Sequence, residues 1–406
     1  MAEEKKKKNN GAGTIAELMS TVKRLELENV SIEADELVLE LTPSLTQVLV
    51  QMMGGAAPGM AAAPGALPKK VGPFKFEAPI AEWKQDILEV TLGATKEEGG
   101  TRDYSVVIGG QKTMPFYTFE ANVPNIPVFS FDIFDMELSL PKAVRMYYDG
   151  VMDSPIEWAK TAIERYNAKM ITLHLISTDP INGKDTSPED SAALIEDMLK
   201  EIKVPMIISG SGNRKKDPPV LVKAAEAASG ERVLLSAALS DNYETIAPAV
   251  IEHNHAVLAL ATMDPAAQKT LTRALVVAGV PRNSIVMDTF TGSLGYGVEY
   301  TITTMERIRQ MSFRGDKDLN YPILSGTSNA WAAREAWRKN DAWGEKLYRG
   351  PLWEATTGLM ALLSGSDIFM MLHPGAIEAL QSITEQLLIE KDESKPMKPE
   401  QWIKGV

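Results

Sequence analysis

Two short clusters of hydroxyl, amide and glycine residues are the parts of this sequence best suited to bind a ligand. They are SGSGN at residues 209–213 and SGTSN at residues 325–329, and each directly follows a short apolar run. Serine, threonine and asparagine side chains both donate and accept hydrogen bonds, and glycine lets the backbone approach a ligand closely. These residue types favour binding of a polar ligand over nucleophilic chemistry.

A polar ending of this kind follows eight apolar runs. The runs cover residues 128–133, 170–176, 206–208, 233–235, 257–261, 285–287, 323–324 and 368–372. Each turns to Ser, Thr, Asp, Asn, Gly or His at its carboxyl end. Helix capping is the alternative explanation, because a loop that enters a helix also needs Ser, Thr, Asp or Gly. The two glycine-containing clusters exceed what one cap requires, so we predict a binding rim.

Helical segments alternate with these runs. Helices are expected near residues 155–167, 188–201, 218–229, 243–253, 265–279, 297–313, 328–339 and 374–390, with an extra one at 351–364. Ser154-Pro155, Ser187-Pro188, Asp217-Pro218 and Asp264-Pro265 each place an N-cap residue before a proline at the first helical position. Strand–helix alternation implies a parallel sheet.

About eight such units match a (β/α)8 barrel, in which all carboxyl strand ends meet on one rim that carries the binding or active site. A doubly wound open sheet is the alternative fold class. It is disfavoured because the first strand–helix units lack the glycine fingerprint that is typical of it.

Metal and thiol chemistry are disfavoured by the residue inventory. The chain has no cysteine, so it forms no disulfide and holds no iron–sulfur cluster through thiolates. The four histidines lack zinc-ligand spacing. His253 and His255 precede a strand and are expected to be structural, His174 is expected in the core, and His373, at a strand end, is the rim candidate.

Acid–base chemistry has only a weak signal. Asp132, Asp135, Asp179 and Asp288 lie near strand ends, where a carboxylate pair is conceivable, although Asp179 and Asp288 also suit helix capping. The segment GSLGYG at 292–297 has reversed glycine spacing and is a poor phosphate cradle. We predict no catalytic residue and no metal site.

Composition divides the chain into five parts. We expect a tail, helix and strand at 1–53, an Ala/Gly/Pro linker at 54–73, a β extension at 74–126 packing on the barrel, the barrel at 127–391 and a tail at 392–406. Within the extension, residues 87–92 and 104–108 are expected to form an antiparallel pair.

Charge and hydropathy exclude several classes of partner. The net charge is −12, which disfavours nucleic acid. No run of 18 apolar residues occurs, which argues against a membrane span, and the N-terminus lacks a secretory signal, so we expect a cytoplasmic protein.

Five segments, taken in order, resemble one known family. They are VFSFDIFD, LHLISTDP, MIISGSGN, YPILSGTSNAW and GPLWEATTGL. Together they are similar to the small (delta) subunit of the corrinoid iron–sulfur protein, in its archaeal form a component of the acetyl-CoA decarbonylase/synthase complex. The likeness covers nearly the whole chain, and its specificity lies in the order and spacing of the segments.

The resemblance implies a barrel that forms a heterodimer with a gamma subunit. Gamma would carry the iron–sulfur cluster, and a cobalamin-type corrinoid would lie between gamma and the rim of this barrel. The corrinoid would carry a methyl group between a methyl-tetrahydropterin and the nickel site that makes or cleaves acetyl-CoA. The absence of cysteine agrees with a subunit that has no cluster.

Strand-end position, rather than matched family contacts, supplies the predicted cofactor-binding residues. Corrin side chains are mostly amides, which hydroxyl and amide groups can recognise. The predicted contacts are Ser177, Thr178, Ser211, Asn213, Thr291, Gly292, Ser325, Gly326, Thr327 and His373.

Two other functions stay open at this point. One is a stand-alone pterin-dependent methyltransferase, in which Asn213 and Asp132 would hydrogen-bond a pterin ring. The other is a purely architectural subunit that holds a complex together without touching the cofactor.

Overall fold

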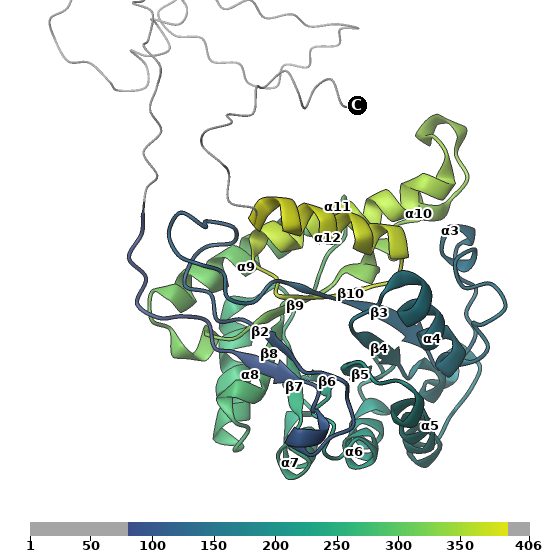
Figure 1. The fold of residues 1–406 in the computed structure, drawn as a ribbon, viewed down its shortest axis with the longest axis horizontal. Helices are drawn as coiled ribbons and strands as arrows, with labels where there is room; N and C mark the ends of the chain where they lie inside the picture. The colour runs from purple at the N-terminus through teal and green to yellow at the C-terminus, as the bar shows by residue number, and fades with distance from the viewer. Residues whose placement is uncertain (1–79, 389–406) are drawn as a thin grey trace, which may run out of the picture. The chain divides into compact units, whose positions relative to one another are not determined.

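The computed structural model describes residues 80–388, and its centre is a closed barrel of eight parallel strands (Figure 1). The strands are β3 (Val128–Phe134), β4 (Ile171–His174), β5 (Met206–Ser209), β6 (Leu234–Ala238), β7 (Ala256–Leu260), β8 (Ile285–Asp288), β9 (Ile323–Gly326) and β10 (Ile368–Met371). Each pairs with the next along the chain, and β10 pairs with β3 to close the ring. The predicted barrel is confirmed, and the open sheet is wrong.

The strands are apolar throughout because both of their faces are buried. Ile207, Leu234 and Val286 point into the barrel, where they form one apolar cluster. Their neighbours Ile208 and Leu235 point outward and pack against the helices in a second cluster. This two-sided burial explains why the sequence shows short continuous apolar runs instead of alternation.

Helices surround the barrel. They are α3 (Lys142–Arg145), α4 (Pro155–Tyr166), α5 (Pro188–Glu201), α6 (Asp217–Ala227), α7 (Tyr243–Glu252), α8 (Pro265–Val277), α9 (Val298–Phe313), α10 (Arg334–Trp337), α11 (Lys346–Ser364) and α12 (Pro374–Leu388). Ser154, Ser187 and Asp264 accept backbone N–H groups as predicted.

The cap expected at Asp217 is wrong. Asp217 is the first residue of α6, and its carboxylate accepts the backbone N–H groups of Ser211 and Gly212 instead. It therefore fixes the preceding loop, which turns back over the helix start.

The segment after β9 also differs from the prediction. Residues 328–339 form a 3₁₀ helix at Thr327–Ala332 and the four-residue α10 instead of one helix. Asn329 donates its side-chain amide to the carbonyl of Thr291, and such polar side chains compete with helix formation. Helix α11 is correspondingly longer than predicted and begins at Lys346, one turn before Pro351.

An antiparallel pair seals the amino-terminal end of the barrel. Strands β1 (Val90–Leu92) and β2 (Val106–Ile108) pair antiparallel, as predicted for this extension. Leu92 and Ile108 join the apolar cluster inside the barrel. The backbone N–H of Gly93 donates to the carbonyl of Arg232, directly before β6. With this end filled by side chains, the carboxyl end is the one that can receive a ligand.

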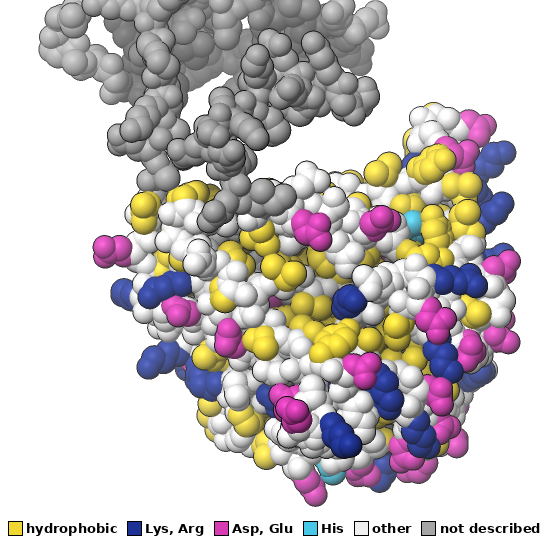
Figure 2. Space-filling view, in the orientation of Figure 1, with side chains coloured by type: hydrophobic (Ala, Val, Ile, Leu, Met, Phe, Trp, Pro, Cys, Tyr) yellow, Lys and Arg dark blue, Asp and Glu magenta, His cyan; other side chains and the backbone are white. Residues whose placement is uncertain are grey.

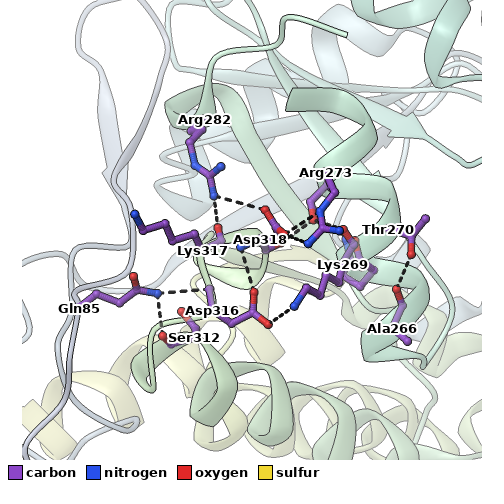
Figure 3. A network of polar contacts seen from close by, with 12 residues as sticks. Gln85, Ala266, Lys269, Thr270, Arg273, Arg282, Ser312, Asp316, Lys317 and Asp318 are labelled. Carbon is purple, nitrogen blue, oxygen red and sulfur yellow. Dashed lines mark hydrogen bonds and ion pairs between the residues drawn. The ribbon is translucent and has the colours of Figure 1, made fainter. Parts of the chain in front are cut away.

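Ion pairs fasten the loop before β9 to α8 (Figure 3). Lys269 lies 2.6 Å from Asp316, and Arg273 lies 2.5 Å from Asp318. Gln85 donates to the carbonyl of Ser312 at 2.7 Å, which ties the segment before β1 to α9. The cations are one-third or more exposed, so each pair adds at most about 1 kcal/mol. Their position, away from the open end, indicates a structural role.

Among the helices of residues 80–388, none is long and apolar enough to cross a lipid bilayer.

Replacement of Leu92 by alanine tests the seal at the amino-terminal end. Leu92 is fully buried inside the barrel, so Leu92→Ala is expected to lower the free energy of unfolding by about 2–4 kcal/mol. The matched control is Thr91→Ala, because Thr91 is half-buried and neighbours Leu92 in β1. Urea unfolding of both variants measures the difference, and equal losses would contradict this packing.

Candidate functional site at the carboxyl end of the barrel

An inward-facing position at or near the carboxyl end is polar on five of the eight strands. These positions are Asp132 on β3, His174 on β4, Ser209 on β5, Ser236 on β6 and Asp288 on β8. We call them the mouth ring. On β5, β6 and β8 the inward positions two residues earlier are leucine, isoleucine or valine, so on these strands the polar group is confined to the open end. On β3 and β4 the corresponding positions are Ser130 and Thr172, which bond to each other.

Register brings members of the ring side by side. His174 pairs with Ser209, and Ser209 pairs with Ser236 in the parallel ladder. The two serine hydroxyl oxygens are 3.5 Å apart. On the opposite wall, Asp288 pairs with Leu260. The ring therefore has Asp132, His174 and the two serines on consecutive strands, with Asp288 apart from them on β8.

Asp132 is the most unusual member of the ring. Its side chain is fully buried, and neither carboxylate oxygen accepts a hydrogen bond from a described residue. The nearest cationic or N–H group is His174 Nε2, 3.2 Å from Oδ1, and the imidazole stacks on Phe134 at 5.0 Å. Buried polar atoms normally have a partner. This end of the ring thus presents unsatisfied acceptors, with His174 as the partly exposed member beside them.

Asp288 is the second carboxylate of the ring. Its Oδ1 accepts the N–H of Phe290 at 2.7 Å. Burial raises the pKa of Asp288 to about 7, and this hydrogen bond opposes the rise. Near neutral pH the carboxyl group is therefore close to half protonated, and it can donate as well as accept a hydrogen bond.

Glu354 lies behind the ring and fixes the end of β10. Helix α11 carries this fully buried carboxyl group, which accepts the N–H groups of Leu372 at 2.7 Å and His373 at 2.9 Å. Burial raises the pKa of Glu354 to about 8, against these two hydrogen bonds. The residue anchors α11 to the barrel and does not line the opening.

Several of the predicted hydroxyl contacts bond to one another. The Oγ atom of Ser325 lies 2.9 Å from Thr291 Oγ1 and 2.7 Å from Thr327 Oγ1, and all three side chains are buried. Because Leu324 faces the barrel interior, Ser325 points to the opposite face of β9, toward the helices. This chain of hydroxyls joins the loops after β8 and β9.

Other predicted hydroxyls bond to nearby carboxylates or carbonyls. Ser177 donates from both N and Oγ to Asp135, and Thr178 donates to the carbonyl of Leu175. Ser211 donates from N and Oγ to Asp217 at 2.8 Å. Burial raises the pKa values of both aspartates, and the serine donors oppose that rise. These contacts hold the loops after β4 and β5 in place.

Gly292 and Gly326, both predicted contacts, have different surroundings. A Cβ atom on Gly292 would lie 2.7 Å from the backbone of Gly297, so glycine is needed there for the loop to fold on itself. At Gly326, the nearest atom to an added Cβ would be Asn329 Nδ2 at 3.5 Å. Gly326 occupies the last inward position of β9 and leaves open space in the mouth.

Asn213 and His373 complete the predicted set. The Oδ1 of Asn213 accepts the N–H groups of Lys215 and Lys216. His373 Nδ1 accepts the N–H groups of Gly375 and Ala376, so the imidazole caps α12. Burial lowers the pKa of His373 to about 4, which leaves its ring neutral near pH 7. Whether any of the ten residues contacts a cofactor stays a prediction.

The prediction from sequence did not single out the mouth ring, because it chose residues mainly from the loops that follow the strands. The predicted runs 206–208, 233–235 and 285–287 each stop one residue short of Ser209, Ser236 and Asp288. His174 was expected in the core, and it does lie on the inner face of β4, at the open end. Across residues 80–388, no group of three or more His, Asp or Glu side chains is arranged to hold a metal ion.

Fold and site together define the class: a (β/α)8 barrel whose carboxyl mouth is polar and whose opposite end is sealed. The family model for the CO dehydrogenase/acetyl-CoA synthase delta subunit matches residues 89–348. The chain belongs to this family, which confirms the resemblance that the sequence segments indicated.

Named relatives are similar to this chain over most of their length. Subunit delta 1 of the acetyl-CoA decarbonylase/synthase complex of Methanosarcina thermophila is 47% identical over 360 residues, covering 86% of this chain and 82% of the relative. Subunit delta of Methanothermobacter thermautotrophicus is 42% identical over 391 residues, with 96% of both chains covered. The protein is thus a delta subunit of an acetyl-CoA decarbonylase/synthase.

Solved structures of dihydropteroate synthases are remote matches to this chain. The Coxiella burnetii enzyme in complex with pteroic acid has a TM-score of 0.45 and 14% identity, covering 74% of this chain and all of that chain. An enzyme from Xanthomonas albilineans has a TM-score of 0.44 over 65% of this chain. This degree of likeness concerns the fold alone.

Ionisation of Asp288 is expected to make stability depend on pH. The folded pKa of about 7 lies above the usual value of 3.8, so the stabilising proton is bound at low pH and lost as pH rises through 7. Asp288→Asn cannot ionise, so its loss of stability between pH 5 and pH 8 should be about 1–2 kcal/mol smaller than that of the unaltered protein. Urea unfolding at both pH values measures this.

The control is Asp149→Asn, which removes an exposed carboxylate beside α3. It should leave the pH slope unchanged. An identical slope for Asp288→Asn and the unaltered protein would contradict the raised pKa.

Proposed function

We propose that this delta subunit forms one wall of a corrinoid site, with the mouth of its barrel facing a cofactor that a gamma subunit holds. When bound, the corrinoid supplies the cobalt that carries a methyl group between a methyl-tetrahydropterin and the nickel site of acetyl-CoA synthesis or cleavage. The residues of this chain bind, orient and shield the cofactor. A cytoplasmic location stays part of this proposal.

The observation that carries the proposal is the mouth ring. Corrin side chains end in amides, which donate through N–H and accept through C=O. Asp132 offers two oxygens that accept no hydrogen bond from a described residue, with His174 Nε2 3.2 Å from one of them, and Asp288 near pH 7 both donates and accepts. The hydroxyls of Ser209 and Ser236 supply further donors and acceptors. The residues present therefore fit an amide-bearing ligand.

The shape of this end of the barrel also suits a shared cofactor. The ring lies at the carboxyl end of the barrel, where Ser209 and Ser236 are largely buried, at 9% and 8% exposed, and His174 and Asp288 are partly exposed. A flat macrocycle laid across this end would cover the ring and exclude water from it. The rest of the cofactor would face outward, where a second subunit is needed to enclose it. Family relatives are named as subunits of a multi-subunit complex, which supports such a partner.

The stand-alone methyltransferase is the second candidate, and Asp132 is the observation that favours it. A buried carboxylate that accepts no hydrogen bond from a described residue also suits the N–H groups of a pterin ring. The two functions differ in what the purified chain does alone. Methyl transfer from a methyl-tetrahydropterin to free corrinoid by this chain without gamma would support the methyltransferase and overturn the corrinoid-wall proposal.

The variant Gly326→Phe tests the corrinoid wall. Gly326 faces the mouth with open space beside it and a backbone φ of −75°, which other residues adopt freely. A phenylalanine ring should therefore be tolerated by the fold and should fill the mouth. We expect the corrinoid content of the delta–gamma complex, measured from its visible spectrum, to fall at least about tenfold.

The matched control is Ser382→Phe, which adds the same ring to an exposed position on α12. It should leave the corrinoid content unchanged. Size-exclusion chromatography of both variants with gamma checks that the complex still forms. Full corrinoid content in an intact Gly326→Phe complex would favour the architectural role instead.

A further inference from the structure

A large cavity lies outside the mouth ring, between the loops that follow β3 and β9. Its volume is about 490 Å³. Leu140, Pro141 and Ala143 line one wall, and Trp331, Trp337 and Leu347 line the other. We call it the tryptophan pocket. Helices α3 and α10, which carry lining residues, lie on the same side of the barrel in Figure 1, and in Figure 2 yellow, dark blue and magenta side chains lie together on that side.

Several contacts fix the pocket wall that comes from the loop after β9. Arg349 donates to the carbonyls of Glu335 and Arg338, both at 2.7 Å, which fixes α10 from beneath. Its guanidinium also lies over the Trp343 ring at 5.4 Å. A Cβ atom on Gly350 would lie 2.3 Å from the Trp331 ring, so glycine lets that indole pack flat on α11. The pocket is therefore preformed.

Two lysines give the pocket its charge. Lys142 and Lys346 line it, both side chains are exposed, and neither ammonium group lies within ion-pair distance of a described carboxylate. No acidic residue lines the cavity. The whole chain carries a net charge of −12, so a lining with only positive charges departs from the rest of the protein. Such a local potential attracts anions.

We propose that the tryptophan pocket binds a planar aromatic ring that carries an anionic group. Trp331 is 9% exposed and Trp337 is 45% exposed, so one indole forms the wall and the other lies open for stacking. The volume suits a single small molecule. The ammonium groups of Lys142 and Lys346 bind the anion, which is a phosphate on a nucleoside or a carboxylate on an aromatic ring. This proposal is independent of the corrinoid role.

Isothermal titration of the full-length chain tests the pocket with two probes, AMP and 1-naphthoate. At least one is expected to bind with a Kd of about 1 mM or tighter, and at least about tenfold more tightly than adenosine or inorganic phosphate alone. Tighter binding of AMP identifies a nucleoside phosphate, and tighter binding of 1-naphthoate identifies an aromatic carboxylate. Failure of both probes to bind below about 5 mM overturns the proposal.

Variants assign the binding to this pocket. The double variant Lys142→Glu/Lys346→Glu should weaken the bound probe at least about tenfold, and Trp337→Ala about fivefold or more. The matched control is Lys317→Glu, which reverses an exposed lysine in the loop before β9. Thermal unfolding checks that all variants fold.

Two results would overturn the proposal. One is equal weakening by Lys317→Glu and by the double variant, which would mean that general charge attracts the probe. The other is loss of probe binding when the delta–gamma complex forms, which would mean that the pocket is covered by a protein partner.

Discussion

A closed barrel of eight strands must be filled by its own side chains, and this constraint decides where a ligand can bind. The antiparallel pair places Leu92 and Ile108 against the amino-terminal layer, and Leu234 and Val286 fill the layers beyond it. A polar group in this core is costly without a partner. The one such pair, Ser130 and Thr172, satisfies itself with a 2.7 Å hydrogen bond. Unpartnered polar groups are tolerable only where water or a ligand reaches them, which is the last inward layer.

Polar residues at the carboxyl end consequently divide into two groups by direction. Those that point outward from the strands or lie in loops bond to one another, as Ser325 does with Thr291 and Thr327. Those that point inward keep unused hydrogen-bonding capacity, as Asp132 does. The outward group fixes the loops, and a fixed rim lowers the entropy that a ligand would lose on binding. Many of the hydroxyls at the strand ends therefore hold the loops in place, and their abundance does not depend on ligand contact alone.

The sequence was sufficient to predict the barrel fold. Apolar runs and Ser-Pro or Asp-Pro helix starts located the eight units, because these signals are local. The sequence was insufficient to predict the direction in which each side chain points. That direction depends on where a strand ends and on register between strands, and the register of β6 against β7 shifts at Ser236 and Ala238. The helix predicted at residues 328–339 failed for a related reason: Trp331 packs on Gly350, a contact with a distant segment.

Electrostatics separates the mouth ring from the tryptophan pocket. The ring contains two carboxylates and one imidazole and has no lysine or arginine, so it favours ligands that donate hydrogen bonds and repels anions. The pocket is lined by Lys142 and Lys346 without any carboxylate, so it favours the opposite charge. A neutral amide group can hydrogen-bond to the ring but has no charge for the lysines to attract. An aromatic anion is attracted by the lysines of the pocket and is repelled by Asp132 in the ring. The two sites therefore favour ligands of different chemistry.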